Sequence, residues 1–252
     1  MDLHVAARQA LACLDLTSLN EADSAADIEA LCRRAQTEFG PVAAVCVWPR
    51  FVAQARALLP AAIKVAAVAN FPAGPLDLAR ALADVEAIAA AGGDEVDVVL
   101  PYRALIAGQA AEVAEFLAEV RHASRPLTLK VIIESGELKT GELIAEATRL
   151  ALMAGADFVK TSTGKSPLSA TPQAAAVMLG EIAASGLPHA GFKASGGIRT
   201  VAEAQVYLQL AADKLGAAAL TPQRLRFGAS GLLNDILATL SGQAPVPATS
   251  AY

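Results

Sequence analysis

Short runs of strand length alternate with longer helical runs along nearly the whole chain, and this alternation restricts the folds that the sequence can adopt. The strand-like runs are apolar and bounded by turn-forming residues; they are residues 13–16, 43–48, 64–70, 95–100, 127–134, 158–162, 191–194 and 224–227. Helical runs lie between and after them; they are residues 23–39, 49–59, 76–91, 110–123, 140–154, 172–184, 201–215 and 231–240. Eight successive strand–helix units predict an α/β fold, a single (β/α)8 TIM barrel whose closed parallel sheet has no edges.

A single domain, the barrel, is predicted for residues 1–241. A chain of 252 residues has the usual size of one α/β barrel, and no linker-like stretch divides it. Residues 3–12 are expected to form an extra N-terminal helix that caps the bottom of the barrel. Residues 242–252 are rich in small residues and proline, which predicts a flexible C-terminal tail.

The composition excludes several classes of partner. The net charge of −5 argues against nucleic acid and anionic membranes, because both bind concentrated basic surfaces. No apolar run reaches the roughly 18 residues of a membrane span, and the N-terminus lacks a basic export signal, so we expect a cytoplasmic protein. The three cysteines and three histidines lack metal-ligand spacing, which predicts no metal site. An odd number of cysteines in an intracellular chain predicts reduced thiols.

Polar and apolar residues alternate within the predicted strands. One face of each strand is apolar and is expected to meet the helices, so the other face points into the lumen of the barrel. The residues of this second face are Asp15, Thr17, Cys46, Trp48, Lys64, Asn70, Asp97, Val99, Lys130, Glu134, Lys160, Ser162, Lys193, Ser195, Arg224, Arg226 and Gly228. The lumen would hold more charged residues than packing needs, which favours an active site. The alternative is that these residues form a purely structural network of buried salt bridges.

Lys160 lies at the centre of residues 158–162, a strand that should be buried. Burial and a neighbouring cation both disfavour an ammonium, so such a lysine tends to become a neutral nucleophile toward carbonyl groups. The alternative is a lysine that buries only its stem and keeps its amine in water. The chain has 13 Arg and only 7 Lys, yet Lys64, Lys130 and Lys193 also lie in or beside predicted strands. Because lysine can lose its proton and arginine cannot, this choice favours amine chemistry.

Glycine-rich turns follow three successive predicted strands, at the end of a barrel where enzymes place their chemistry. Glycine lets backbone N–H groups approach an anion, and the helix that follows adds positive potential. A single such turn is weak evidence, but three in succession predict a phosphate site, in which Lys165 and Arg199 would supply charge. The turns are Gly164-Lys165, Gly196-Gly197-Ile198-Arg199 and Gly228-Ala229-Ser230-Gly231.

Asp97 and Lys193 are expected to lie across the barrel from this phosphate site, beside Lys160. Lys193 would keep Lys160 neutral by like-charge repulsion, and Asp97 would exchange protons directly or through water. A neutral amine adds to a carbonyl to give an iminium, which accepts the electrons of a carbon–carbon bond that breaks. The three residues therefore predict a carbonyl-trapping enzyme.

Many short motifs, spread in order over essentially the whole chain, resemble those of the deoxyribose-phosphate aldolase family. They are Leu14-Asp15-Leu16-Thr17, Asn70-Phe71-Pro72, Asp94-Glu95-Val96-Asp97-Val98-Val99, Lys130-Val131-Ile132-Ile133-Glu134, Val159-Lys160-Thr161-Ser162-Thr163-Gly164, Lys193-Ala194-Ser195-Gly196-Gly197-Ile198-Arg199 and Arg226-Phe227-Gly228-Ala229-Ser230. The resemblance implies a class I aldolase, without metal or cofactor, that reversibly cleaves 2-deoxy-D-ribose 5-phosphate into D-glyceraldehyde 3-phosphate and acetaldehyde. It also implies a homodimer.

The resemblance assigns roles residue by residue. Lys160 matches the Schiff-base lysine, and Asp97 and Lys193 match the proton-transfer pair. The family's phosphate-binding loops match Gly164, Lys165, Gly196, Gly197, Arg199, Gly228 and Ser230. Gly231 departs from the family pattern, because some members have a second serine at this position. The chain therefore lacks one hydroxyl that would bind phosphate. Auxiliary roles are expected for Asp15, Thr17, Cys46 and Tyr252; the tail would bring the Tyr252 hydroxyl over the barrel mouth to assist proton transfer.

Two other functions remain open from the residues themselves. A different phosphosugar barrel enzyme, such as a transaldolase-like aldolase or an isomerase, would keep the glycine turns but need not trap substrate on Lys160. A non-catalytic sugar-phosphate-binding protein would need the turns and no group of Lys160, Lys193 and Asp97.

Overall fold

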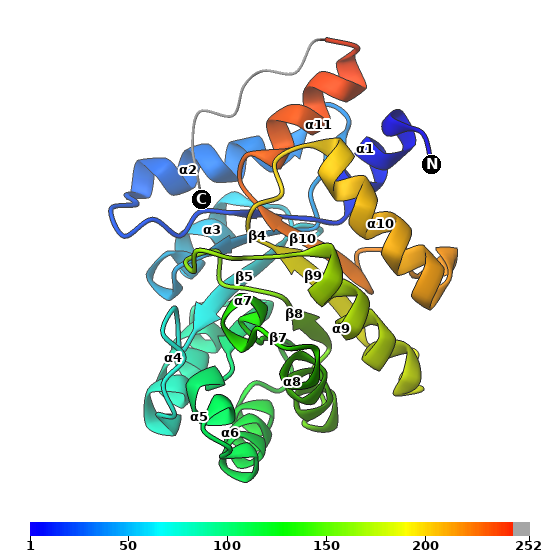
Figure 1. The fold of residues 1–252 in the computed structure, drawn as a ribbon. Helices are drawn as coiled ribbons and strands as arrows, with labels where there is room; N and C mark the ends of the chain where they lie inside the picture. The colour runs from blue at the N-terminus through cyan, green and yellow to red at the C-terminus, as the bar shows by residue number, and fades with distance from the viewer. Residues whose placement is uncertain (244–252) are drawn as a thin grey trace.

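The computed structural model describes residues 1–243, and these form one closed barrel of parallel strands with helices outside it (Figure 1). Each strand pairs with the next along the chain, and β1 pairs with β10 to close the sheet. The barrel strands are β1 (Leu14–Thr17), β4 (Ala44–Val47), β5 (Lys64–Ala69), β6 (Glu95–Val99), β7 (Thr128–Ile132), β8 (Phe158–Lys160), β9 (Gly191–Ser195) and β10 (Leu225–Ala229). The predicted α/β barrel is therefore confirmed.

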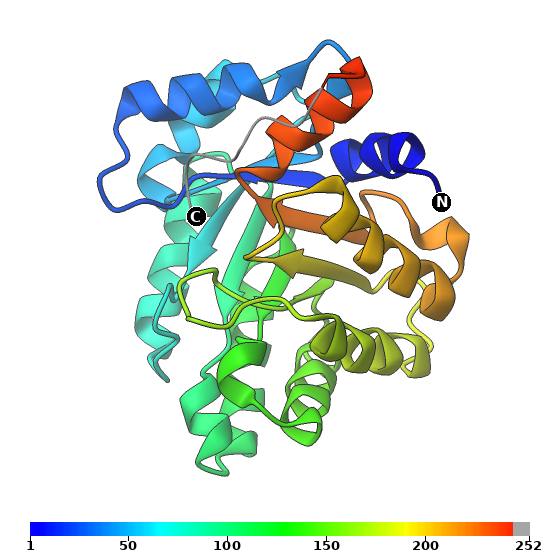
Figure 2. The same ribbon diagram turned by 45° about the horizontal axis from the view of Figure 1, so that its top comes forward.

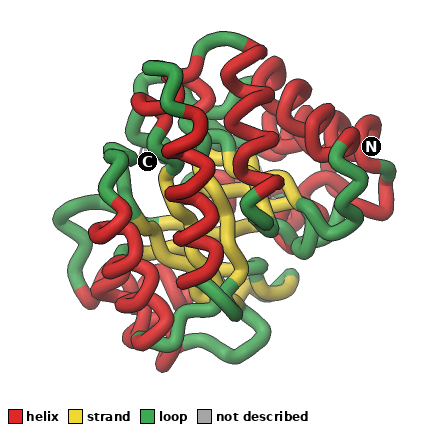
Figure 3. Tube along the Cα trace, turned by 90° about the horizontal axis from the view of Figure 1, so that it is seen from below, coloured by secondary structure: helices red, strands yellow, loops and turns green. Residues whose placement is uncertain are grey.

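Helices surround the yellow strands in Figure 3 and cover their apolar face. The longer helices are α1 (Leu3–Ala12), α2 (Ala25–Arg34), α3 (Val52–Leu58), α4 (Leu78–Ala90), α6 (Ala110–Ala123), α8 (Gly141–Met153), α9 (Pro172–Ala184), α10 (Val201–Leu215) and α11 (Leu232–Ser241). Several begin at a side-chain cap; Thr171 caps α9, and Thr200 with Glu203 forms a capping box at α10. No helix in this described part of the chain is both long and apolar enough to cross a membrane.

The N-terminal helix α1 forms as predicted, but it lies on the outside of the barrel. It packs beside α10 and α11 (Figure 2), and the Gln9 side-chain amide donates to the carbonyl of Leu220. The bottom of the barrel, where the strands begin, instead has an open pocket of about 360 Å³ whose lining includes Lys64, Glu95 and Arg226. The helix therefore covers the barrel wall and leaves the bottom accessible.

The helix predicted for residues 23–39 is too long. Helix α2 ends at Arg34, and β2 (Gln36–Thr37) and β3 (Gly40–Pro41) form a small antiparallel hairpin after it. The Thr37 hydroxyl donates to the Gly40 carbonyl at 2.6 Å and accepts the Phe39 N–H at 3.2 Å. Gly40 has φ 121°, a region open mainly to glycine, so the helix cannot continue through this segment.

Other differences involve short elements at strand ends. Strand β8 ends at Lys160 rather than residue 162, and β7 ends before Glu134. The helices α5 (Tyr102–Ile106) and α7 (Ser135–Leu138) and the 3-10 helix η2 (Ala217–Ala219) were not predicted, whereas the helix predicted for residues 49–59 forms as the 3-10 helix η1 (Pro49–Phe51) followed by α3. Each helix that was not predicted is at most five residues long, which gives too little helical periodicity to detect in a sequence.

Aspartates at the bottom of the barrel join helices to strand starts. Asp157, which precedes β8, accepts the backbone N–H of Leu129 at 2.8 Å and the Arg121 guanidinium at 2.9 Å. Asp94, which precedes β6, makes the equivalent contacts with the strand and the helix before it. Because a carboxylate accepts both donors, the strand start and the helix are fixed relative to each other.

We predict that Asp157→Ala lowers the free energy of unfolding by about 1–3 kcal/mol, because it leaves the Leu129 N–H and the Arg121 guanidinium without this acceptor. Urea denaturation measures the change. Asp213→Ala, on the exposed side of α10, is the matched control and should change stability by less than about 0.5 kcal/mol. Equal losses in the two variants would contradict the role of Asp157.

Candidate active site

Seven ionisable side chains meet in the lumen of the barrel and are almost completely buried. None is more than 6% exposed. They come from six different strands, so only the closed barrel brings them together. This ionic cluster consists of Asp15, Glu95, Asp97, Lys130, Lys160, Lys193 and Arg226.

Asp97 lies at the centre of the ionic cluster and contacts three amines. Its Oδ2 accepts from Lys160 Nζ at 2.9 Å and from Lys193 Nζ at 2.7 Å, and its Oδ1 accepts from Lys130 Nζ at 2.7 Å. Burial alone raises the pKa of the Asp97 carboxyl, but the three lysines outweigh burial and hold that pKa well below its usual range. Asp97 is therefore a carboxylate, and it draws Lys160 and Lys193 to one oxygen.

The remaining carboxylates lie deeper in the barrel. Asp15 accepts from Lys193 at 2.5 Å through Oδ2 and from Arg226 at 2.6 Å through Oδ1. Glu95 bridges Arg226 at 2.9 Å and Lys130 at 2.5 Å. Burial raises the pKa of Asp15, yet the adjacent cations outweigh this and lower it below its ordinary value. Both acids therefore serve as charge partners of the cations.

The charges of the ionic cluster balance only when one amine is neutral. Four cationic side chains face three carboxylates, and an unpaired buried charge is strongly disfavoured. Lys160 is the cation with one carboxylate contact, whereas Lys130, Lys193 and Arg226 each contact at least two. The proton of Lys160 is therefore the one that the cluster holds least firmly.

The pKa values follow this geometry. Burial lowers the pKa of the Lys160 amine; Asp97 opposes this, Lys193 reinforces it, and the net direction is downward. Burial also lowers the pKa of Lys193, but Asp15 and Asp97 outweigh it and the net direction is upward. Lys193 therefore holds its proton more firmly than Lys160 does, which is the order of pKa values that a nucleophilic Lys160 would need.

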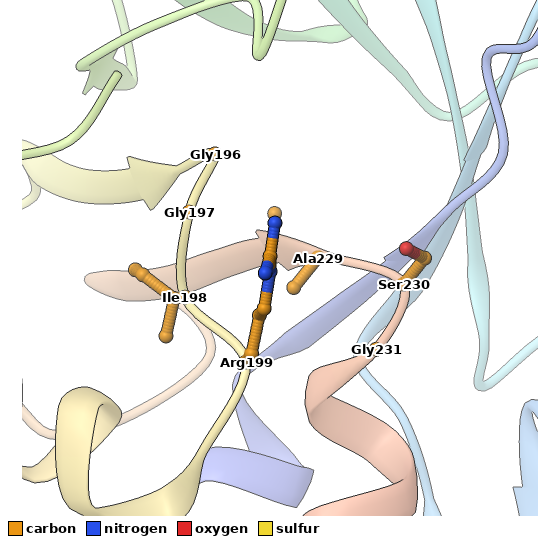
Figure 4. A pocket seen from close by; sticks show the side chains of 8 residues that line it. Gly196, Gly197, Ile198, Arg199, Ala229, Ser230 and Gly231 are labelled. Carbon is orange, nitrogen blue, oxygen red and sulfur yellow. The ribbon is translucent and has the colours of Figure 1, made fainter. Parts of the chain in front are cut away.

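The predicted phosphate turns form a pocket at the mouth of the barrel. Figure 4 shows two turns around it, with Arg199 on the turn after β9 and Ser230 on the turn after β10. Residues of both turns line this pocket; they are Gly196, Gly197, Ile198, Arg199, Gly228, Ala229, Ser230 and Gly231. Gly164 lies against it, because a Cβ added to Gly196 would be 3.1 Å from the Gly164 Cα. Lys165 follows and is exposed.

Helix α11 begins directly after the second turn. Its N-cap residue is Gly231, which provides no side-chain cap, so the first N–H groups of this ten-residue helix lack that partner in the described structure. The N-terminus of α10 differs, since Glu203 accepts the N–H groups of Arg199 and Thr200. Backbone N–H groups at α11 can therefore bind an anion where the missing serine hydroxyl would have done so.

The auxiliary residues have different environments. Asp15 belongs to the ionic cluster, whereas the Thr17 hydroxyl donates to the backbone carbonyl of Asp15 at 2.8 Å. Cys46 is buried beside the ionic cluster, and burial is the main cause that raises the pKa of its thiol. Tyr252 lies outside the described residues, so its part in proton transfer stays a prediction.

Alternation within strands misplaced the residues at strand starts. Lys64 is half exposed, with 46% of its side chain accessible, and pairs with Asp94 at 3.5 Å. Arg224 donates to the Ala190 carbonyl at the bottom of the barrel. Alternation defines the face of a strand but not the height of a residue in the barrel, so both residues lie outside the ionic cluster.

Three members of the ionic cluster were not predicted as site residues. Lys130 and Arg226 were assigned to the lumen but given no role there, and Glu95 was overlooked. Glu95 lies two residues before Asp97 on the same strand, so the alternation signal that placed Asp97 in the lumen applies equally to Glu95.

Comparisons with known proteins find aldolases that are similar to this chain over nearly its whole length. The DeoC/LacD family aldolase pattern matches residues 9–238. The deoxyribose-phosphate aldolase of Agrobacterium fabrum (strain C58 / ATCC 33970) is 49% identical over 250 residues, which cover 98% of this chain and 96% of that protein. Two solved structures share the fold. A candidate deoxyribose-phosphate aldolase from Coccidioides immitis has a TM-score of 0.80 and 28% identity, and the match covers 91% of this chain and 86% of that chain. A candidate deoxyribose-phosphate aldolase from Toxoplasma gondii ME49 has a TM-score of 0.87 and 24% identity, and the match covers 97% of this chain and 99% of that chain.

We predict that changes in the ionic cluster shift the pKa of Lys160 in opposite directions. Lys130→Met removes a cation, so the Lys160 ammonium becomes less disfavoured and its pKa rises; Glu95→Gln removes an anion, so that pKa falls. Each shift should be about 1 pH unit. Mass analysis of Lys160 after labelling with acetaldehyde and cyanoborohydride over a range of pH measures both.

Lys64→Met is the control for this pair of variants, because Lys64 is a half-exposed strand lysine outside the ionic cluster. Its labelling curve should coincide with that of the unaltered protein. Curves that move in the same direction for Lys130→Met and Glu95→Gln would contradict the charge balance.

Proposed function

This chain belongs to the DeoC/LacD family of aldolases, and we propose that it is a deoxyribose-phosphate aldolase whose Schiff-base residue is Lys160. The reaction is the reversible cleavage of 2-deoxy-D-ribose 5-phosphate into D-glyceraldehyde 3-phosphate and acetaldehyde. The observation that carries the assignment of Lys160 is its place in the ionic cluster: a buried amine, at the end of β8, whose neutral form balances the surrounding charges.

The proposed mechanism starts with the neutral Lys160 amine. It adds to the C1 aldehyde of the open-chain sugar, and loss of water gives an iminium. Removal of the C3 hydroxyl proton then breaks the C2–C3 bond, whose electrons move into the iminium to form an enamine. D-Glyceraldehyde 3-phosphate leaves, and protonation of the enamine at C2 followed by hydrolysis releases acetaldehyde and restores Lys160.

Asp97 and Lys193 are the proposed proton-transfer pair. Asp97 is ionised and can accept a proton, whereas Lys193 is an ammonium and can donate one. Lys160 and Lys193 both donate to the same carboxylate oxygen of Asp97, so a proton that moves directly or through one water remains close to the iminium. Asp15 keeps Lys193 charged through a contact of 2.5 Å.

The glycine turns at the barrel mouth are the proposed site for the 5-phosphate of the sugar. Arg199 and Lys165 supply positive charge, Ser230 supplies a hydroxyl, and the glycines expose backbone N–H groups. Phosphate and carbonyl would then bind at separate places, which fixes the sugar chain between them and orients C1 toward Lys160. Assembly as a homodimer stays an expectation from the family resemblance, and location in the cytoplasm stays an expectation from the sequence patterns.

We predict that Lys160→Arg lowers aldol cleavage at least about 10³-fold and removes borohydride-dependent incorporation of acetaldehyde, because arginine stays protonated and forms no imine. Lys64→Arg, a strand lysine outside the ionic cluster, is the matched control and should retain activity. Wild-type-like turnover by Lys160→Arg would end the Schiff-base assignment.

We predict that Arg199→Ala lowers kcat/KM for deoxyribose 5-phosphate about tenfold more than for unphosphorylated deoxyribose, since a phosphate contact has no counterpart in the second substrate. Steady-state kinetics with both sugars measure this ratio. Arg33→Ala, on the exposed face of α2, controls for loss of surface charge. Equal losses on both sugars would exclude Arg199 from the phosphate site.

A further inference from the structure

Glu134 has a backbone conformation that its residue type rarely adopts. It follows β7 directly, is 1% exposed, and has φ 53° and ψ 59°, in the left-handed region that disfavours side chains other than glycine. Hydrogen bonds hold the chain on both sides: Ile133 N–H donates to the Lys160 carbonyl at 3.0 Å and Ser135 N–H to the Thr161 carbonyl at 2.8 Å. Strain that the surroundings maintain in this way often accompanies a functional site.

The Glu134 side chain reaches the turn that follows Lys160. Its Oε2 accepts from the Thr163 hydroxyl at 2.5 Å, and both carboxylate oxygens lie 3.3 Å from the Thr163 backbone nitrogen. The Thr163 hydroxyl in turn accepts the backbone N–H of Lys165 at 3.0 Å. One buried carboxylate therefore fixes the conformation of residues 163–165.

The loop after β8, which contains this turn, lies between the turn after β9 and helix α7 at the barrel mouth. On one side, a Cβ added to Gly196 would lie 3.1 Å from the Gly164 Cα, so the turn contacts the pocket of Figure 4. On the other side, a Cβ added to Gly136 of α7 would overlap the Leu168 carbonyl oxygen. The loop after β8 thus has close neighbours on both sides, and a change in its turn would displace the wall of the phosphate pocket.

We propose that Glu134 is a positioning residue that, through Thr163, holds Gly164 and Lys165 in place for the 5-phosphate and so determines the preference for phosphorylated over unphosphorylated sugars. This inference rests on the proposed function. It assigns Glu134 no contact with the reacting atoms; the carboxylate acts by fixing the turn between the Schiff-base lysine and the phosphate pocket.

A direct effect of Glu134 on Lys160 is the competing explanation. Burial raises the pKa of the Glu134 carboxyl, Thr163 opposes this by hydrogen bonding, and Lys160 also acts electrostatically on that carboxyl. If Glu134 acted chiefly on Lys160, its removal would move the pH dependence of imine formation and would affect all sugars equally. If instead Glu134 acts through the turn, its removal should affect only the phosphorylated sugar and should leave the pH dependence of imine formation unchanged.

The test uses Glu134→Gly together with Thr163→Val and Thr163→Ser. Glycine removes the carboxylate and accepts the left-handed backbone without strain; valine removes the Thr163 hydroxyl, and serine keeps it. For Glu134→Gly and Thr163→Val, we expect the ratio of kcat/KM for deoxyribose 5-phosphate to that for deoxyribose to fall about tenfold. Thr163→Ser should stay within about twofold of wild type, and Glu137→Gln, in the same short helix, is the matched control.

An unchanged ratio in Thr163→Val would overturn the inference, even if Glu134→Gly failed to fold. Equal losses on both sugars, with a shifted pH dependence of Lys160 labelling by acetaldehyde and cyanoborohydride, would overturn it in favour of the direct effect on Lys160. Labelling of the wild-type protein tests the proposed function separately. If Lys160 of the wild-type protein were not labelled, the Schiff base itself would be rejected, whatever the Glu134 variants show.

Discussion

Four buried cations share three carboxylates in the lumen of this barrel, and Asp97 is the carboxylate on which three of them converge. Such a network adds little net stability, because desolvation offsets most of the attraction between its charges. Its consequence is chemical: the excess positive charge is removed when Lys160 loses its proton. The network of salt bridges and the proposed nucleophile, Lys160, therefore belong to one arrangement.

The barrel separates the parts of the site along its axis. The bottom holds aspartates that join strand starts to helices, the middle holds the ionic cluster, and the mouth holds the glycine turns. Because each charged group comes from a strand that is paired on both sides, its position has little freedom. Chemistry that depends on the position of one proton is best supported by such a rigid frame.

A short turn at the barrel mouth connects Lys160, the proposed Schiff-base residue, with the proposed phosphate pocket. Lys160 ends β8, and only four residues separate it from Lys165. The Glu134 carboxylate holds the turn between them from the neighbouring strand end. Under the proposed function, substrate binding and covalent chemistry share one short segment, so the orientation of the sugar would depend on the same hydrogen bonds that fix the end of β8.

The sequence by itself determined the eight strand–helix units, the polar face of each strand, the unusual strand lysines and the glycine turns, because these depend on local spacing and residue type. Only the tertiary structure decided which polar residues meet. It brought Glu95 and Arg226 into the ionic cluster, left Lys64 at the rim, replaced the end of a predicted helix with a hairpin, and gave Glu134 its left-handed backbone. The physical reason is that the alternation of polar and apolar residues defines only the face of a strand to which a side chain points. The height of that side chain in the barrel, and its contacts with strands distant in sequence, depend on the register of the closed sheet.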